Sequence, residues 1–438
     1  MTPIPTTRRA LLRHRAQLSA GAALLLVTSA CGSSDSEGST TAVPDAKIVA
    51  PVAGMTCNEG TKPTGDPIVV GGSLSLTGPL SETAKVHEGV AELVTKWVND
   101  CGGIDGRPLK WDVLDDQSTP AQVASNYERL IGEHVDLVMG PYGGANTLAA
   151  AGPVTQAGYA FPTHTNGAPQ ELIGENHFPA WQFDGTGDKE HMFDAGATTL
   201  WDALKSSGNP PKSVFYATAK FPTTLSLAAA AKSRFEKEGV KTTGDVEYEF
   251  GTTDFSSIAL RISQADPDLV YLGGLGADTT YLYDAFDSIG YTPRSVFAAL
   301  PSPASLAGLD DEVNGLLTLS IFETDSALGD TDIARYFGKQ YDEVAKDDDL
   351  FPLIETQAAA SFAAWQILLT GVVNAGVDNK AIIAWLNSNS VDTIAGSLKF
   401  DGYNNYGGDI NRVTQIQDGK RVLVWPKDVA GGTIDYKP

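Results

Sequence analysis

Cysteine is scarce in this chain of 438 residues, which contains only Cys31, Cys57 and Cys101. Two cysteines as far apart as Cys57 and Cys101 do not form a paired zinc-ligand motif. The six histidines show no metal-ligand spacing either. We therefore expect neither a bound metal nor a cofactor.

Basic residues are also few. The chain has 31 Lys and Arg residues against 54 Asp and Glu residues, which gives a formal net charge of −23 at pH 7. The phosphates of nucleic acid would repel such a chain, so no nucleic-acid partner is expected. An apolar fraction of 42 % and a charged fraction of 19 % are ordinary for a globular protein, and the length suits two or three domains.

Several common catalytic motifs are missing. The sequence contains no G-x-S-x-G, no H-E-x-x-H, no phosphate-binding Walker motif and no G-x-G-x-x-G after a predicted strand. The adjacent acids Asp115 and Asp116 would point to opposite faces of a strand. We therefore expect no catalytic residues and no enzyme, and a secreted enzyme is the less favoured alternative.

The N-terminus differs from the rest of the chain. Residues 1–31 carry four arginines and no acid, followed by the apolar run LSAGAALLLVTSAC. This run is shorter than the ~20 residues that span a bilayer. A basic stretch, an apolar stretch and small residues in this order are typical of an export signal, with a buried core helix as the alternative. Residues 32–65 begin with small polar residues and are expected to be a flexible tether and lead-in segment.

Strand and helix patterns then alternate along the chain. The expected strands are 68–76, 109–116, 136–140, 159–166, 213–218, 245–250 and 268–274. The expected helices are 83–99, 120–131, one from Gly144, 188–206, 223–238, 255–264 and 278–289, followed by 331–344, 355–373 and 379–386. This alternation predicts an α/β protein with two doubly wound, mostly parallel sheets, and residues 395–425 read as a small antiparallel set.

One passage occurs twice. DLVMGPYGGANT covers residues 136–147, DLVYLGGLGADT covers residues 268–279, and the two agree at six of twelve positions. Each is an apolar run followed by a glycine-rich bend and a helix start. Loops after the carboxyl ends of parallel strands build the binding crevice of such sheets. We therefore expect each half to contribute one wall of a ligand site.

Four segments resemble type I periplasmic-binding proteins, in particular the leucine/isoleucine/valine-binding group of solute receptors of ABC importers. They are VVGGSLSLTGPLSETA, WVNDCGGIDGRPLKWDVLDDQSTPAQVASNYERLI, DLVMGPYGGANTLAAAGPV and GSLKFDGYNNYGG. The resemblance covers about residues 66–425 and implies two lobes joined by a three-strand hinge. Lobe one would be 66–185 plus 321–395, and lobe two 186–320 plus 396–438.

The ending VTSAC of the export signal resembles that of a bacterial lipoprotein, which implies a lipid on Cys31 and anchoring to the outer face of the cytoplasmic membrane. TRRALL resembles a twin-arginine motif, so the general and the twin-arginine export routes both remain open. If Cys31 carries lipid, Cys57 and Cys101 remain as a pair in an oxidising compartment. A disulfide between them is expected, with two free buried thiols as the alternative.

The resemblance also implies ligand contacts on the loops of both lobes. The expected ligand-binding residues are Ser75, Thr77, Ser81, Glu82, Tyr142, Gly143, Gly144, Ala145, His164, Thr165, Phe221 and Asp278. Thr165 matches a loop that holds the ligand's carboxylate, and His164 stands where the family has a small residue. Asp278 matches an acid that faces the ligand's ammonium group. The alternatives are that the glycines only form a turn, that His164 is an ordinary loop histidine, and that Asp278 only caps its helix.

The function implied by the resemblance is solute capture by closure of the two lobes outside the cytoplasm. The solute is expected to be an amino acid, of the branched-chain type or similar, delivered by a monomer to the permease subunits of an ABC importer. An amide, an aromatic acid or a polyamine is the alternative ligand. A sensory ligand-binding protein is the alternative function. The candidate loops contain no arginine, which disfavours a strongly anionic ligand.

Overall fold

The computed structural model describes residues 48–166, 174–182, 194–302, 310–347, 354, 356–400 and 410–436. The expected export signal with Cys31 and residues 32–47 of the expected tether lie outside this part of the chain. Lys47–Pro438 forms one compact unit by its internal contacts.

The first sheet is parallel throughout. It consists of two parallel strand sets: β1 (Ile68–Leu74), β2 (Leu109–Asp115) and β3 (Leu137–Val138) form one, and β4 (Phe161–Asn166) and β5 (His177–Gln182) form the other. β1 lies between β2 and β3, and β4 pairs with β5. The Gly140 N–H donates to the Pro162 carbonyl at 2.8 Å, which connects the end of β3 to β4.

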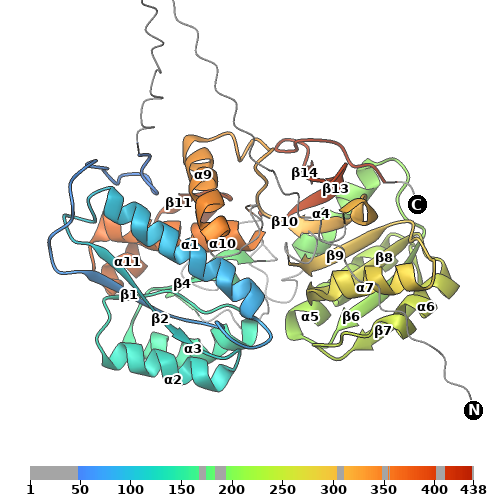
Figure 1. Ribbon diagram of the computed structural model, residues 1–438, viewed down its shortest axis with the longest axis horizontal. Coiled ribbons are helices and arrows are strands. Elements are labelled where there is room, and N and C mark those ends of the chain that lie inside the picture. Colours follow the sequence, from blue (N-terminus) through green and yellow to red (C-terminus); the bar gives the residue numbers. More distant parts are fainter. Residues whose placement is uncertain are drawn as a thin grey trace, which may run out of the picture. The chain divides into compact units, whose positions relative to one another are not determined.

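Helices cover both faces of this sheet, as Figure 1 shows. They are α1 (Ser81–Asp100), α2 (Pro120–Gly132) and α3 (Gly144–Ala157). Ile68 and Val70 of β1 lie in the same buried cluster as α1, whereas Val69 packs against the cluster that contains α2. Successive side chains of a strand point to opposite faces. The apolar run of β1 is therefore the consequence of burial on both sides.

The second sheet has seven strands in the order β14-β13-β10-β9-β8-β6-β7. They are β6 (Ser213–Ala219), β7 (Lys241–Tyr248), β8 (Leu269–Gly276), β9 (Val296–Pro301), β10 (Leu317–Ser320), β13 (Arg412–Gln417) and β14 (Lys420–Trp425). β6 to β10 are parallel, and β13 and β14 are antiparallel additions at one edge. A short 3-10 helix, Asp310–Val313, precedes β10.

The second sheet is also covered on both faces. Its helices are α4 (Asp194–Ser206), α5 (Pro222–Lys237), α6 (Ser256–Ala265) and α7 (Asp278–Ser288). Tyr216 and Tyr271 pack in the cluster that contains α4 and α5, while Phe215 and Val270 pack with α6 and α7. Both sheets are therefore doubly wound, and the predicted fold class is confirmed.

The remaining helices return to the first sheet. They are α9 (Asp332–Asp347), α10 (Thr356–Ala375) and α11 (Asn379–Leu386). α10 contacts α1, β4 and β5, and in Figure 1 the orange α10 lies beside the blue α1. By length and composition α10 is long and apolar enough to cross a membrane, but 83 % of its most apolar window is buried in the protein. Such extensive burial is typical of a helix in the core of a globular protein.

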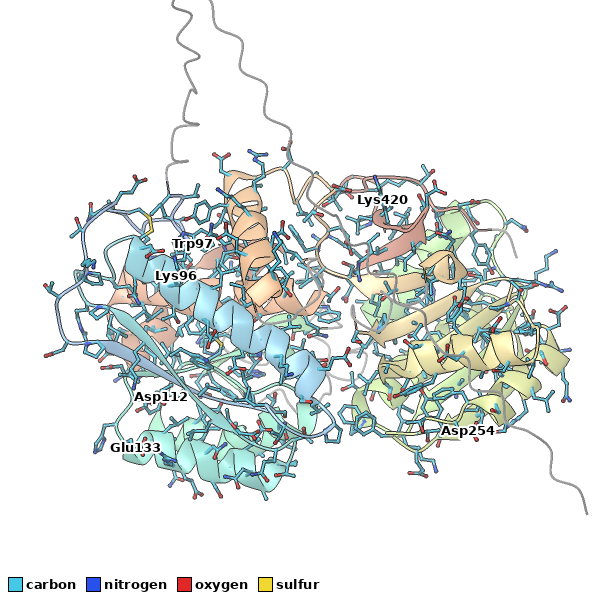
Figure 2. All side chains as sticks on the ribbon, viewed as in Figure 1. Lys96, Trp97, Asp112, Glu133, Asp254 and Lys420 are labelled. Atoms are coloured by element: carbon cyan, nitrogen blue, oxygen red, sulfur yellow. A yellow bond between two sulfur atoms is a disulfide. The ribbon has the colours of Figure 1, made fainter. Side chains whose placement is uncertain are left out.

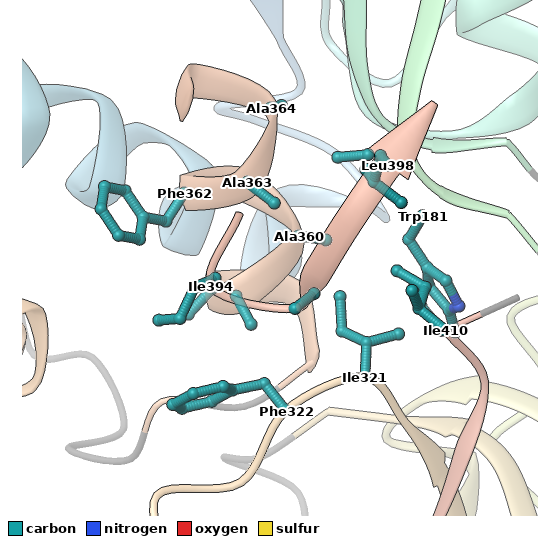
Figure 3. Close-up of a cluster of buried hydrophobic side chains, with 14 of the residues drawn as sticks. Trp181, Ile321, Phe322, Ala360, Phe362, Ala363, Ala364, Ile394, Leu398 and Ile410 are labelled. Carbon is teal, nitrogen blue, oxygen red and sulfur yellow. The ribbon is translucent and has the colours of Figure 1, made fainter. Parts of the chain in front are cut away.

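One expected lobe boundary falls inside a hairpin. β11 (Ser390–Thr393) pairs antiparallel with β12 (Gly396–Lys399), so the expected boundary between residues 395 and 396 lies in their turn. Ile394 and Leu398 pack into the same cluster as α10, together with Ile321 and Ile410 (Figure 3). We therefore move this proposed crossing between the lobes beyond Lys399.

The lead-in segment packs against the first lobe. Cys57 and Cys101 are joined in a disulfide, which confirms the expected pairing and anchors the segment to the end of α1 near Trp97 (Figure 2). Val52 is buried, and the Trp97 indole N–H donates to the Val49 carbonyl at 2.6 Å. From residue 48 onward the expected tether is therefore part of the fold.

Candidate functional site

Two neighbouring cavities lie where the carboxyl ends of both sheets meet. The inner cavity has a volume of about 420 Å³ and is lined by Leu80, Tyr142, Gly143, Gly144, Thr165, Trp181, Phe221, Thr223, Leu275, Leu300 and Gln357. The outer cavity has a volume of about 770 Å³, and among its lining residues are Glu82, Tyr142, Phe250, Asp278 and Tyr281. Leu80, Tyr142 and Leu275 line both cavities. Both halves of the chain thus contribute walls to both cavities.

The loop after β3, which belongs to the first repeated passage (residues 136–147), forms one wall of the inner cavity. Gly143 has a φ of 93°, a backbone conformation that glycine adopts without strain. It directly precedes α3, whose first N–H groups have no carbonyl partner within the helix. Tyr142, Gly143 and Gly144 all line the cavity. This arrangement presents an aromatic ring and a helix N-terminus, which attracts an anionic group.

His164 and Thr165 are neighbours on β4 but have different surroundings. Thr165 lines the inner cavity. His164 lines neither cavity: it is buried and stacks on His87 of α1, with ring centroids 4.0 Å apart. This separation follows from the alternation of side chains along a strand. Burial lowers the pKa of His164 to about 3, against the effect of its hydrogen bond to the Pro141 backbone.

Two of the three hydroxyl residues predicted on the first loop, Ser75 and Thr77, bind carboxylates of the protein itself. The Ser75 hydroxyl donates to Asp116 Oδ1 at 2.6 Å, and burial raises the pKa of Asp116. The Thr77 hydroxyl donates to Asp115 Oδ2 at 2.7 Å. Both therefore stabilise the loop after β1, and neither lines a cavity.

The first turn of α1 meets the opposite half through Glu82. Its Oε1 accepts a hydrogen bond from the Ser302 hydroxyl, which follows β9, at 2.8 Å. Glu82 lines the outer cavity, whereas the adjacent Ser81 lines neither cavity. Leu80, just before the helix, lines both cavities instead. Ala145, the last predicted residue of the glycine loop, is exposed and also lines neither cavity.

Phe221 lies on the opposite wall of the inner cavity, as expected. It directly precedes α5, and its ring packs against Phe250 with centroids 5.2 Å apart. Phe250 belongs to the loop after β7 and lines the outer cavity. The two rings therefore form a continuous aromatic surface from one cavity to the other.

Asp278 is the one acid of the second passage that faces a cavity. It is the first residue of α7 and makes no capping bond within that helix. Instead its Oδ2 accepts hydrogen bonds from the Tyr248 hydroxyl at 2.8 Å and from the Leu275 N–H at 3.0 Å. No hydrogen bond from the described residues reaches Oδ1. Burial raises the pKa of Asp278, while the two hydrogen bonds act in the opposite direction.

Gly274 makes room for this carboxylate. A Cβ at Gly274 would lie 2.9 Å from Asp278 Oδ2 and 2.9 Å from the Tyr248 hydroxyl oxygen. In the first passage the residue that matches Asp278 is Asn146. Its amide donates to the Tyr142 carbonyl at 3.0 Å and to Ser75 at 3.4 Å, so it holds the loop. The Asn-to-Asp difference thus separates a structural residue from a cavity-facing acid.

Several lining residues escaped the sequence analysis: Leu80, Trp181, Thr223, Leu275, Leu300 and Gln357. Thr223 is two residues after the predicted Phe221. Trp181 lies on β5, which the sequence pattern did not mark as a strand. Gln357 is one of two glutamines in a largely apolar helix, and nothing in the sequence pattern distinguishes it from Gln366.

A family model described as periplasmic binding protein matches residues 67–420. Leu/Ile/Val-binding protein homolog 1 of Brucella melitensis is 27 % identical over 211 residues, which cover 48 % of this chain and 54 % of that protein. The match thus spans about half the length of this curated relative. The amino acid binding protein of Pseudomonas aeruginosa is 25 % identical over 342 residues, or 76 % of this chain and 86 % of that protein.

Solved structures share the fold. A solute-binding protein of an ABC transporter from R. palustris, solved in complex with benzoate, superposes with a TM-score of 0.67 at 19 % sequence identity. The superposition covers 85 % of this chain and 98 % of that one. At this identity the likeness establishes the fold alone. Since the family model matches most of the sequence, the chain belongs to the periplasmic binding protein family.

Proposed function

We propose that the protein captures a small polar solute, most directly an amino acid, between its two halves and delivers it to an ABC importer. The observation that carries this proposal is the inner cavity, whose walls come from the carboxyl ends of both sheets. We assign its residues the role of binding the solute without catalysing a reaction.

The two walls offer complementary groups to a zwitterion. On the first wall, the Thr165 hydroxyl and the N–H groups at the start of α3 are suited to a carboxylate. On the second wall, Asp278 Oδ1 is suited to an ammonium group. An ion pair in such a partly buried site is stronger than one on the surface.

The charge of the lining residues narrows the solute class. No Lys, Arg or His is among the described residues that line either cavity, whereas Glu82 and Asp278 line the outer one. A dicarboxylate or a phosphate would therefore find no cationic partner among these described residues. The relatives from Brucella melitensis and Pseudomonas aeruginosa, a Leu/Ile/Val-binding protein homolog and an amino acid binding protein, also favour an amino acid.

The proposed cellular location is the one that the sequence predicts. Export and a lipid on Cys31 would hold the receptor at the outer face of the cytoplasmic membrane, where it would meet the permease subunits as a monomer. Cys31 lies outside the described residues, so this part rests on the sequence alone.

A thermal-shift screen of amino acids, amides, aromatic acids and polyamines tests the proposal. A solute at 100 times its dissociation constant stabilises the folded state by about 2.7 kcal/mol. We expect at least one amine-bearing solute to raise the melting temperature. Asp278→Asn should weaken its binding by about 30-fold or more, because a buried ammonium group would lose its counter-charge.

Asp284→Asn is the matched control, because Asp284 lies on the same helix with an exposed side chain. It should bind the solute as the unaltered protein does. Equal affinity of Asp278→Asn and the unaltered protein would reject the role of Asp278. A screen in which no small solute shifts the melting temperature would reject solute capture.

A further inference from the structure

The side-chain amide of Gln357 lies at the wall of the inner cavity and makes no hydrogen bond to the described residues. Gln357 is in the first turn of α10 and is 8 % exposed. Its Oε1 is enclosed and has no hydrogen-bond partner in the described chain. The described residues make no hydrogen bond to its amide nitrogen either. Buried amides in folded proteins are nearly always hydrogen-bonded, so this one requires an explanation.

Gln366, on the same helix, shows what a structural glutamine looks like here. Its amide nitrogen donates to the Pro51 carbonyl at 3.1 Å, and its Oε1 accepts from the Ile394 N–H at 2.7 Å. Gln366 therefore joins α10 to the lead-in segment and to the turn after β11. Gln357 makes no such connection.

Two threonines and Tyr142 bring hydroxyl groups to the inner cavity beside Gln357. Thr165 comes from β4 and Thr223 from the first turn of α5, on the opposite wall. The side chain of Thr223 is 5 % exposed and makes no hydrogen bond to a described residue. The other lining side chains are apolar or aromatic, and no described residue that lines this cavity carries a charge.

These groups define what the cavity can accept. A hydrocarbon group would leave the Gln357 amide buried without a partner, which is costly. A charged group would find no opposite charge among the described side chains that line this cavity. An uncharged amide or hydroxyl group can donate to and accept from both a glutamine amide and a threonine hydroxyl.

We propose that Gln357 is a ligand-binding residue that selects solutes whose inserted end carries an uncharged hydrogen-bonding group. This inference rests on the proposed function and deepens it. The charged end of the solute faces Asp278 and the start of α3, and the other end meets Gln357 and Thr223. A solute with a purely hydrocarbon side chain, such as leucine or valine, is then the weaker ligand.

The test compares solutes of equal shape that differ only in polarity. Calorimetric titration of the purified chain would use L-asparagine against L-leucine, L-threonine against L-valine, and 4-hydroxybenzoate against 4-methylbenzoate. We expect the polar member of any pair that binds to be preferred by about tenfold or more, because a site built to hydrogen-bond rejects an analogue that cannot. This comparison needs no variant.

Gln357→Met provides the second measurement. It keeps the length of the side chain and removes both hydrogen-bonding groups, so the preference for the polar member should fall about tenfold while the apolar member binds no worse. Gln366→Met is the matched control and should lower the melting temperature without changing the preference.

The outcomes separate the two proposals. Preference for the apolar member, or equal weakening of both members by Gln357→Met, overturns the role of Gln357 and leaves solute capture standing. If no solute in the three pairs or in the wider screen binds, solute capture fails and the selective role of Gln357 fails with it.

Discussion

Asp136 and Asp268, the first residues of the two repeated passages, each hold the start of a neighbouring strand. Asp136 Oδ2 accepts from the Val69 N–H at 2.8 Å. Asp268 Oδ2 accepts from the N–H groups of Lys212 and Ser213 at 2.9 and 3.1 Å. The repetition of this residue is therefore structural, because each passage fixes the strand beside it at the end opposite the cavities.

Single residues also mark the limit of sequence-based prediction at the site. Of the residues predicted to bind the ligand, Thr165 and Phe221 line the inner cavity and Asp278 lines the outer one. His164 and Ser75 have the right residue types on the right segments, but their side chains lie elsewhere. The direction of a side chain depends on strand register and on partners such as Asp116, which are distant in sequence.

The buried pair of His87 and His164 predicts a loss of stability in mild acid. Burial lowers the pKa of both, in His164 to about 3, while an unfolded histidine titrates near 6.5. The folded state therefore binds fewer protons, so its stability is complete above pH 6.5 and falls as the pH drops towards 3. His164 alone should contribute a loss of about 2 kcal/mol between pH 7.5 and 5.0.

Urea unfolding at the two pH values measures this loss. In His164→Phe, which keeps an aromatic ring beside His87, the decrease in unfolding free energy should be smaller by about 2 kcal/mol. His134→Asn replaces an exposed histidine, and its unfolding free energy should decrease between the two pH values as much as that of the unaltered protein. If His164→Phe and the unaltered protein lose the same stability, the pair does not titrate as described.

At the scale of helices and strands, the sequence predicted the order of elements well and their ends less well. α11 spans Asn379–Leu386 as expected, because Asp378 caps it with a hydrogen bond from the Ala381 N–H. β7 begins at Lys241, before the expected 245, because backbone pairing with β6 continues through polar residues. β3 is only two residues long, since the chain bends away towards β4.

The disulfide is an element-scale constraint with a measurable effect. Cys57 and Cys101 are separated by 44 positions in sequence, and closing a loop of this length is expected to stabilise the fold by about 4 kcal/mol. The double variant Cys57→Ala, Cys101→Ala should lose about this much in urea unfolding. Reductant should destabilise the unaltered protein similarly and leave the variant unaffected. A variant as stable as the unaltered protein would contradict this account.

At the scale of the whole described chain, two residues form hydrogen bonds with the segments that we propose as the three crossings between the lobes. Asn411 accepts from the Trp181 indole N–H at 3.2 Å and donates to the Gln182 carbonyl at 3.4 Å. The Arg412 guanidinium donates to the carbonyls of Ile321, Ile410 and Ala395 at 2.8, 2.6 and 3.0 Å. Segments far apart in sequence thus share buried hydrogen bonds, which no local pattern could predict.

Arg412→Met should therefore destabilise the protein strongly. It keeps the aliphatic stem but leaves three buried carbonyl groups without this donor, which we expect to lower the unfolding free energy by about 3 kcal/mol or more. Arg335→Met, at an exposed arginine paired with Asp330 and Asp332, should leave the unfolding free energy nearly unchanged. Denaturant unfolding of both variants provides the comparison, and equal small effects would show that the crossings do not depend on Arg412.

Hydrogen–deuterium exchange with and without the solute that gives the largest thermal shift tests the central claim most directly. If one small solute is held between the two halves, amides in residues 142–147 and in residues 275–281 should both exchange more slowly when it is bound. The two segments come from different sheets, so protection of both requires a shared site. Protection confined to one half, or to neither, would contradict the account.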